Sequence, residues 1–227
     1  MLKWQQVSRN ILSLFLHPNC SLCGRSAEKI LCENCASQLE QCRLSQPRFQ
    51  GKGGVSVFAW GEYGGMVKRA IAQLKYEQAP ELARPLGVYL GETWLALAPS
   101  SLKPIVVPIP LHPEKQKQRG YNQAELIARS FSQTTGLPLQ GQGLKRIRNT
   151  KALFGLSPQQ RQQVVAEAFA LGKGLNRKHP VILIDDIYTT GTTVETAQIT
   201  LEKQGIKVMA VGAIAASRVA FRGTTQP

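Results

Sequence analysis

The chain has 227 residues and a mass of 24.9 kDa, and 43% of its residues are apolar, which suits one ordinary domain plus a small additional module. The 28 Lys and Arg residues against 14 Asp and Glu give a net charge of +14, which favours phosphate-rich partners: nucleic acid, anionic lipid or phosphorylated small molecules. These values exclude a disordered chain, and five cysteines in a chain of this length exclude a disulfide scaffold.

Residues 2–16 carry apolar side chains at nearly helical spacing. This spacing predicts a short helix that packs on its own protein, with a helix lying on a membrane surface as the alternative. The apolar run Ile11–Leu16 is shorter than the roughly 7–15 residues of a secretory signal core. No stretch reaches the ~18–20 apolar residues that span a bilayer. We therefore expect no membrane insertion and a cytoplasmic location.

Two C-x-x-C pairs follow, Cys20 with Cys23 and Cys32 with Cys35. Each pair presents two sulfur atoms from a tight turn, and four thiolates complete the tetrahedral coordination that Zn²⁺ prefers. The four cysteines therefore predict a structural zinc site, with redox-active thiols as the alternative. The fifth cysteine, Cys42, is left without a role.

The composition changes after residues 49–54, a glycine-rich linker or turn. Short apolar runs predict strands at 55–60, 104–108, 180–184 and 207–216. Helical patterns occupy 63–74, 81–98, 122–134 and 194–204. Strands that alternate with helices of about ten or more residues indicate an α/β domain with a parallel sheet. We expect an N-terminal helix and zinc-ribbon module at 1–48 and the α/β domain at 49–222.

The segment 181–193 is the most informative part of the chain. Four apolar residues, Val181 to Ile184, predict a strand buried on both faces, and Asp185 and Asp186 follow it. A loop leads from this acid pair into a helix; its residues, here called the threonine loop, are Thr189, Thr190, Gly191, Thr192 and Thr193. Open α/β sheets bind their ligands at the carboxyl ends of the strands, so a binding site is expected here.

The residue types of this segment suit a sugar phosphate. Gly191 lets backbone amides approach an anion, and the amides that open the next helix carry the positive end of its dipole. Threonine hydroxyls add hydrogen bonds without charge. The acid pair can accept hydrogen bonds from two ribose hydroxyls and help to hold Mg²⁺ through water. A simple helix N-cap, the alternative, explains one Thr or Asp and not the whole set.

Taken together, the motifs resemble the ComF family, whose members join an N-terminal zinc ribbon to a type I phosphoribosyltransferase domain. The resemblance rests on the four paired cysteines and on five further pieces in the family's order: residues 74–76, 107–111, 119–123, 146–150 and 181–193. It implies a type I phosphoribosyltransferase-like fold, a mostly parallel sheet flanked by helices, behind the ribbon.

The resemblance also implies a ligand, 5-phosphoribosyl-1-pyrophosphate (PRPP) with Mg²⁺. The acid pair would act in catalysis by facing the ribose hydroxyls and the metal, and the threonine loop would bind the 5′-phosphate. The turn after Pro108 would meet the pyrophosphate. Lys75 and Arg119 are the candidates to bind the pyrophosphate charge, with solvated surface cations as the alternative. No role is assigned to His17, His112 or His179.

Two positions depart from the family pattern. Leu153 stands near the place of a glutamine, and Gln162, Gln163 and Val164 follow Arg161 where an asparagine is usual. Both changes fall where an acceptor or a nucleic acid would be recognised.

Two functions are compatible with these residues. Phosphoribosyl transfer needs fixed acids, a phosphate loop and cations at the leaving group, and no protein nucleophile; the acceptor is unidentified. The resemblance instead favours a protein of natural transformation that handles single-stranded DNA in the cytoplasm, beside other competence-machinery proteins. The basic stretch 103–151 carries only Tyr121 and Phe131 as aromatic residues, which predicts contacts dominated by phosphate.

Overall fold

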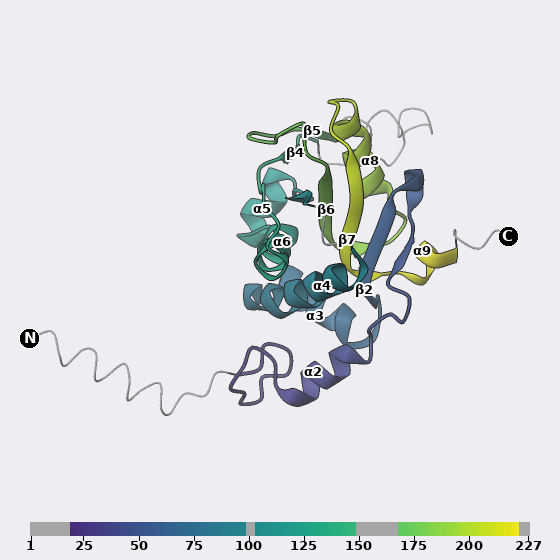
Figure 1. Cartoon of the computed structure of the whole chain (residues 1–227). Coiled ribbons are helices and arrows are strands. Elements are labelled where there is room, and N and C mark those ends of the chain that lie inside the picture. The colour runs from purple at the N-terminus through teal and green to yellow at the C-terminus, as the bar shows by residue number, and fades with distance from the viewer. Residues whose placement is uncertain (1–18, 99–102, 149–167, 223–227) are drawn as a thin grey trace, which may run out of the picture.

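The computed structural model describes residues 19–98, 103–148 and 168–222. The helix expected at 2–16 and the departures at Leu153 and Val164 lie outside these ranges. A five-stranded sheet forms the centre, in the order β1-β2-β7-β6-β3 (Figure 1). Its strands are β1 Arg48–Gln50, β2 Ser56–Glu62, β3 Ile105–Pro108, β6 Val181–Tyr188 and β7 Val208–Ala216. Only β1 is antiparallel to its neighbour, so the expected mostly parallel α/β sheet is confirmed.

The central strands are buried on both faces. All four residues from Val181 to Ile184 are 0% exposed. Ile182 and Ile184 face one hydrophobic core, while Val181 and Leu183 face a second core on the other side. Helices cover both faces of a parallel sheet, which is why its strands read as continuous apolar runs.

Three long helices cover the first face: α3 Gly65–Tyr76, α4 Ala83–Leu97 and α6 Gln123–Thr135 (Figure 1). A 3-10 turn, η2 Pro80–Leu82, precedes α4, and a short helix, α5 Pro113–Arg119, precedes α6. The second face is covered by α8 Thr192–Glu202 and by a small antiparallel hairpin of β4 Leu144–Arg146 and β5 Phe169–Leu171. Helix α9 Arg218–Arg222 follows β7. Within the described ranges, every helix is too short or too polar to cross a membrane.

The cysteine-bearing segment packs on the α/β domain. It contains helix α2 Glu33–Glu40, which lies beneath α3 in Figure 1. Leu22 and Leu39, at 1% and 0% exposure, belong to the same hydrophobic core as Leu74 of α3 and Leu82 of η2. A segment this small gains a core by sharing that of its neighbour. The division of the chain at residue 48 stays a prediction.

The structure differs from the expected elements in two ways. The strand expected at 180–184 continues to Tyr188, because β6 keeps pairing with β7 as far as Ala216. The sequence patterns did not predict α2, α5, α9, β1, β4 and β5, which are short and have no long apolar pattern. Residues 51–54, expected as a linker or a turn, form a turn with η1 Lys52–Gly54 between two strands of one sheet.

Candidate functional site

The acid pair lies near the carboxyl end of β6, between two parallel neighbours. Asp186 is 4% exposed and Asp185 is partly exposed. The backbone N–H of Asp186 donates to Oδ1 of Asp185 at 2.8 Å. Burial, together with the neighbouring Asp186 carboxylate, raises the pKa of Asp185 well above its ordinary value. Ionisation of both acids is therefore unfavourable unless cations or hydroxyl donors lie close to the pair.

Asp186 is held by two side chains from the helical face. Lys75, at the end of α3, forms an ion pair with Oδ2 of Asp186. Gln123, at the start of α6 and 4% exposed, donates from Nε2 to Oδ1 at 3.2 Å. Arg119 in turn donates to Oε1 of Gln123. The structure thus brings together both cations that the sequence motifs indicated: Lys75 contacts Asp186 directly, and Arg119 reaches it through Gln123.

A cavity of about 380 Å³ opens beside these cations. Its lining, here called the cationic cavity, is Lys75, Tyr76, Gln78, Lys115, Gln118 and Arg119. The lining holds three cations and no acid, which suits an anion with several charges. The guanidinium of Arg119 lies over the exposed ring of Tyr76, 5.6 Å from its centroid. Gln78 has a φ of 52°, which is uncommon for a residue other than glycine.

The threonine loop connects β6 to α8. Gly191 is the N-cap of α8 and has a φ of 74°, in the left-handed region that favours glycine. A Cβ at this position would also overlap the Tyr188 hydroxyl. The hydroxyls of Thr190 and Thr192 lie 3.1 Å apart. The first N–H groups of a helix have no acceptor within it, so the amides of Thr192, Thr193 and Val194 can donate to an anion, whereas the N–H of Glu195 already donates to the carbonyl of Gly191.

The turn after β3 lies at the same edge of the sheet. The N–H of Ile109 donates to the carbonyl of Ile184 at 2.8 Å, next to the acid pair. Asn122, 6% exposed, donates from Nδ2 to the carbonyl of Ile109 at 3.0 Å and caps α6 through Oδ1. Three segments that are distant in sequence, 74–76, 109–123 and 184–186, therefore meet at one place, and the threonine loop follows the last of them along the chain.

Two residues of the site had been given no role. Gln123 carries the contact between Arg119 and Asp186. Arg146, on β4, lies over the ring of Phe169 at 5.4 Å; burial lowers its pKa, and the charge of Asp185 opposes that shift. Both belong to motifs that carry the family resemblance, at 119–123 and 146–150, and this membership could have marked them as candidate site residues.

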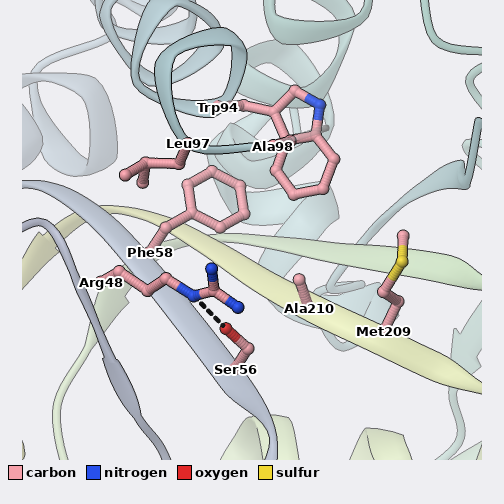
Figure 2. Close-up of a pocket in the computed structure, with 8 residues that line it drawn as sticks. All are labelled: Arg48, Ser56, Phe58, Trp94, Leu97, Ala98, Met209 and Ala210. Carbon is pink, nitrogen blue, oxygen red and sulfur yellow. Dashed lines mark hydrogen bonds between the residues drawn. The ribbon is translucent and has the colours of Figure 1, made fainter. Parts of the chain in front are cut away.

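A second cavity lies at the amino-terminal ends of β2 and β7, away from the acid pair (Figure 2). Phe58, Trp94 and Leu97 line it, and Arg48 donates to Ser56 at its edge at 3.1 Å. Its volume is about 70 Å³, far below the roughly 300 Å³ at which ligand pockets begin. This cavity is therefore too small for a sugar phosphate.

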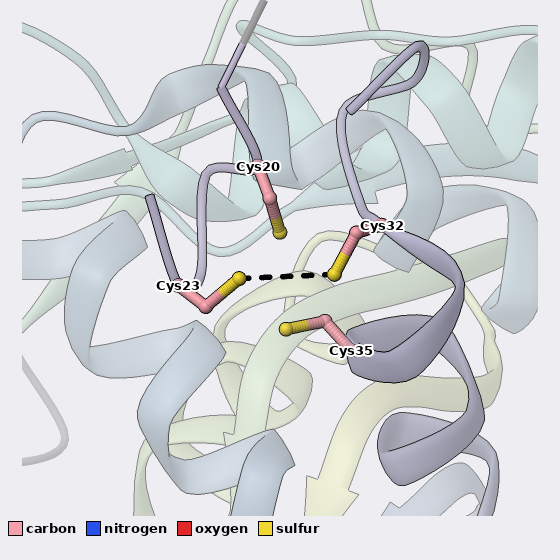
Figure 3. A group of neighbouring side chains, drawn as sticks. All are labelled: Cys20, Cys23, Cys32 and Cys35. Carbon is pink, nitrogen blue, oxygen red and sulfur yellow. Dashed lines mark hydrogen bonds between the residues drawn. The ribbon is translucent and has the colours of Figure 1, made fainter. Parts of the chain in front are cut away.

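The four paired cysteines converge on one point (Figure 3). Their sulfur atoms all lie within 4.8 Å of one another, and those of Cys23 and Cys32 are 3.7 Å apart. A tetrahedral site with Zn–S distances of about 2.3 Å requires sulfur separations of about 3.8 Å, so the cluster has the size of a zinc site.

The pKa values of two of the thiols shift in opposite directions. Burial opposes ionisation of Cys20, but backbone hydrogen bonds, from Cys32 first, lower its pKa to about 6. Burial raises the pKa of Cys35, so a cation is needed to keep all four deprotonated. The four cysteines can therefore hold a metal such as zinc. Cys42 lies outside the cluster, with its sulfur 3.6 Å from the carbonyl of Gln38.

Two solved structures are similar to parts of the chain. Glutamine PRPP amidotransferase from B. subtilis, complexed with ADP and GMP, is 19% identical with a TM-score of 0.39, over 60% of this chain and 26% of that one. The protein TT1426 from Thermus thermophilus is also 19% identical with a TM-score of 0.39, over 62% of this chain and 77% of that one. No family model matches the chain.

Curated proteins match over most of the chain. Competence protein F of Haemophilus influenzae is 27% identical over 86% of this chain and 89% of its own length. Competence protein ComFC of Bacillus subtilis is 28% identical over 82% and 72%. DNA utilization protein YhgH of Escherichia coli (strain K12) is 30% identical over 80% and 83%. The chain therefore belongs to the ComF family, with the competence and DNA utilization proteins.

Proposed function

We propose that this protein binds PRPP together with Mg²⁺ at the carboxyl edge of its sheet, and that it acts in DNA uptake by handling single-stranded DNA in the cytoplasm. The observation that carries the proposal is the meeting of the acid pair, the threonine loop and the cationic cavity at one edge. These three parts match the three parts of the ligand: ribose, 5′-phosphate and pyrophosphate.

Each part has a physical reason to bind its share of the ligand. The amides and hydroxyls of the threonine loop offer donors to a phosphate dianion at the positive end of the α8 dipole. The partly exposed carboxylate of Asp185 is available to accept hydrogen bonds from ribose hydroxyls. Lys75, Lys115 and Arg119 surround a cavity without acids, which suits the pyrophosphate.

The acid pair also fits a hydrated Mg²⁺ ion. Two adjacent carboxylates beside a phosphate site are the oxygen ligands that Mg²⁺ takes, usually through water. When bound, the ion would neutralise charge on the pyrophosphate. Lys75 and Asp186, which form an ion pair, would then lie side by side at the bound ion and pyrophosphate.

The family supports the biological part of the proposal. Its members are named for competence and DNA utilization, and the net charge of +14 favours a polyanionic partner. Other competence proteins are proposed as partners. The chain is proposed to consist of two parts, a zinc module at 1–48 and a phosphoribosyltransferase-like domain at 49–222.

Calorimetry on the full zinc-loaded chain tests the ligand. PRPP titrated in the presence of Mg²⁺ is expected to saturate one site per chain. The double variant Asp185→Asn with Asp186→Asn is expected to lose this binding, because both carboxylates are removed. Glu92→Gln changes an exposed acid on α4 and is the matched control, with binding expected to stay unchanged. A double variant that binds PRPP as well as the wild type does would place the site elsewhere.

A salt titration tests the DNA part. Affinity for a single-stranded oligonucleotide is expected to fall steeply between about 50 and 200 mM salt, because binding through phosphates releases counterions. An affinity that does not change with salt would remove DNA from the proposal.

Phosphoribosyl transfer is the second candidate function. It is favoured by the same cavity, since cations at the pyrophosphate would stabilise its departure. Incubation of PRPP, Mg²⁺ and a cell extract with the protein is expected to release pyrophosphate in this case. Release that persists in the Asp185→Asn/Asp186→Asn variant would assign the activity to another protein.

A further inference from the structure

The turn at 51–54 packs directly on the threonine loop. The N–H of Lys52 donates to the hydroxyl of Tyr188 at 2.8 Å, and this tyrosine is 3% exposed. A Cβ on Gly51 would lie 2.7 Å from the same hydroxyl, and a Cβ on Gly191 would overlap it from the other side. The hydroxyl of Tyr188 therefore contacts both the turn and the threonine loop, and a side chain at Gly51 or at Gly191 would collide with it.

The side chain of Lys52 passes over the start of α8. Its Cβ lies 3.1 Å from where a Cβ on Gly191 would stand. Its ammonium forms an ion pair with Oε2 of Glu195, in the first turn of α8, at 2.9 Å. The side chain of Lys52 is 50% exposed and that of Glu195 is 26% exposed, so the pair is open to exchange with a dissolved anion.

A phosphate bound at the threonine loop would need a cation nearby to balance its negative charge. The threonine loop supplies amides and hydroxyls but no formal charge. Glu195 is the acid of the first turn, and its carboxylate repels an incoming dianion. Lys52 carries its ammonium on a flexible four-carbon stem; its Cβ lies beside Gly191 and its ammonium lies at Glu195, in the first turn of α8.

We propose that Lys52 is a further binding residue for the 5′-phosphate of the ligand. In the structure its ammonium is paired with Glu195. When a phosphate occupies the threonine loop, the ammonium pairs with the phosphate. The inference rests on the proposed function, which places the 5′-phosphate at this loop. It adds a residue from the opposite end of the domain sequence, 136 positions before Tyr188.

The competing explanation is that Lys52 only neutralises Glu195. The two explanations differ in a background where Glu195 is already neutral. If Lys52 contacts the phosphate, Lys52→Ala weakens binding whether or not Glu195 carries a charge. If it serves only as a counter-ion, Lys52→Ala has no effect once Glu195→Gln is present.

The test uses the two halves of the ligand as separate probes. Ribose 5-phosphate and Mg²⁺-pyrophosphate are titrated by calorimetry into the full zinc-loaded chain and into Lys52→Ala, Lys52→Arg, Glu195→Gln and Lys52→Ala/Glu195→Gln. Lys52→Ala is expected to weaken ribose 5-phosphate binding about tenfold, the effect of losing one charge-assisted hydrogen bond, in both backgrounds. Pyrophosphate binding is expected to stay unchanged, and Lys52→Arg to keep most of the affinity.

Thermal unfolding is the control that the Lys52 variants are folded. The bond to Tyr188 comes from the backbone N–H of Lys52, which alanine retains, so thermal unfolding midpoints are expected to match the wild type. An equal loss for both probes, or no loss in the Glu195→Gln background, would overturn the assignment. Wild-type protein that binds pyrophosphate but not ribose 5-phosphate would also overturn it. Wild-type protein that binds neither probe would overturn the proposed function itself.

Discussion

At the scale of single residues, Asp185 and Asp186 place two carboxylates side by side in a mostly buried strand. Asp186 is compensated by Lys75 and Gln123. Asp185 has Arg146 as a nearby positive charge but lies among buried groups. Acids with perturbed pKa values are common at functional sites. A ligand that brings cations or hydroxyl donors would offset the cost of placing two acids side by side in a buried position.

The pH dependence of stability follows from Asp185. Burial and the Asp186 carboxylate raise the pKa of Asp185 above its ordinary value of 3.8, so the folded state favours the protonated acid. This contribution to stability is present below the unfolded pKa and is lost as pH rises through the raised folded pKa. Asp185→Asn should therefore be more stable than the wild type at pH 8, with the difference shrinking towards pH 5. Urea unfolding without Mg²⁺ measures it.

Glu92→Gln serves as the reference for this pH series, because its carboxyl is exposed on α4. It should follow the wild-type curve at every pH. A wild-type stability that rises from pH 5 to 8 relative to Asp185→Asn would contradict the account of the acid pair.

At the scale of elements, two glycines of α4, Gly87 and Gly91, allow α4 and α6 to pack closely. A Cβ on Gly87 would lie 2.5 Å from Cβ of Ser130 and 2.7 Å from the carbonyl oxygen of Ile127. Gly91 meets Thr134 in the same way, at 2.8 Å. The contact matters for the site, because α6 carries Gln123 and is capped by Asn122.

Gly87→Ala tests this contact. Alanine favours a helix over glycine by about 1 kcal/mol, but overpacking against a backbone carbonyl costs about 3 kcal/mol at the upper end. We expect a net loss of about 2 kcal/mol in the free energy of unfolding, measured in urea. The matched control is Gly141→Ala, whose Cβ would meet only the flexible end of Glu125 at 3.4 Å. Equal stability of the two variants would show that the helices do not pack as described.

The cysteine segment makes a separate prediction. The purified chain should carry one zinc ion, and chelation should lower the unfolding midpoint, because Leu22 and Leu39 lose the support of the metal. Cys35→Ser should reduce the zinc content and the midpoint. Cys42→Ser, outside the cluster, should keep full zinc. Zinc content that falls equally in both variants would argue against a site built from the four paired cysteines.

The sequence predicted the elements that have a strong local pattern. The apolar run at 181–184 and the helical stripes at 122–134 and 194–204 correspond to β6, α6 and α8 within a few residues. The hairpin of β4 and β5 could not be predicted, because its three-residue strands pair across a separation of more than twenty residues. Helix α5 is polar throughout, so its formation depends on the cap at His112 and on Pro113.

At the scale of the whole molecule, the fold gathers separate segments of the chain at one edge of the sheet. The sequence motifs named the acid pair, the threonine loop, Lys75 and Arg119. The contact between Gln123 and Asp186, which are 63 residues apart, and the place of Lys52 depend on tertiary packing, which spacing along the chain does not encode. Gln123 carries no charge that would mark it within the motif 119–123, and Lys52 lies in a segment that the sequence identified only as a linker or a turn.

The cysteine-bearing segment and the acid pair share the same supporting helix. Leu74 lies in the core that receives Leu22 and Leu39, and the next residue, Lys75, pairs with Asp186. A change in the cysteine-bearing segment therefore has a short physical route to the acid pair through α3.

Phosphorus NMR of PRPP gives the most direct measurement, because the ligand's 5′-phosphate and pyrophosphate have separate signals. With the full zinc-loaded chain and Mg²⁺, both sets of signals should shift or broaden, since the threonine loop and the cationic cavity each hold one end. With Asp185→Asn/Asp186→Asn, both should return to their free positions. Signals that stay at the free-ligand positions with wild-type protein in excess would contradict the assignment of this edge as a PRPP site.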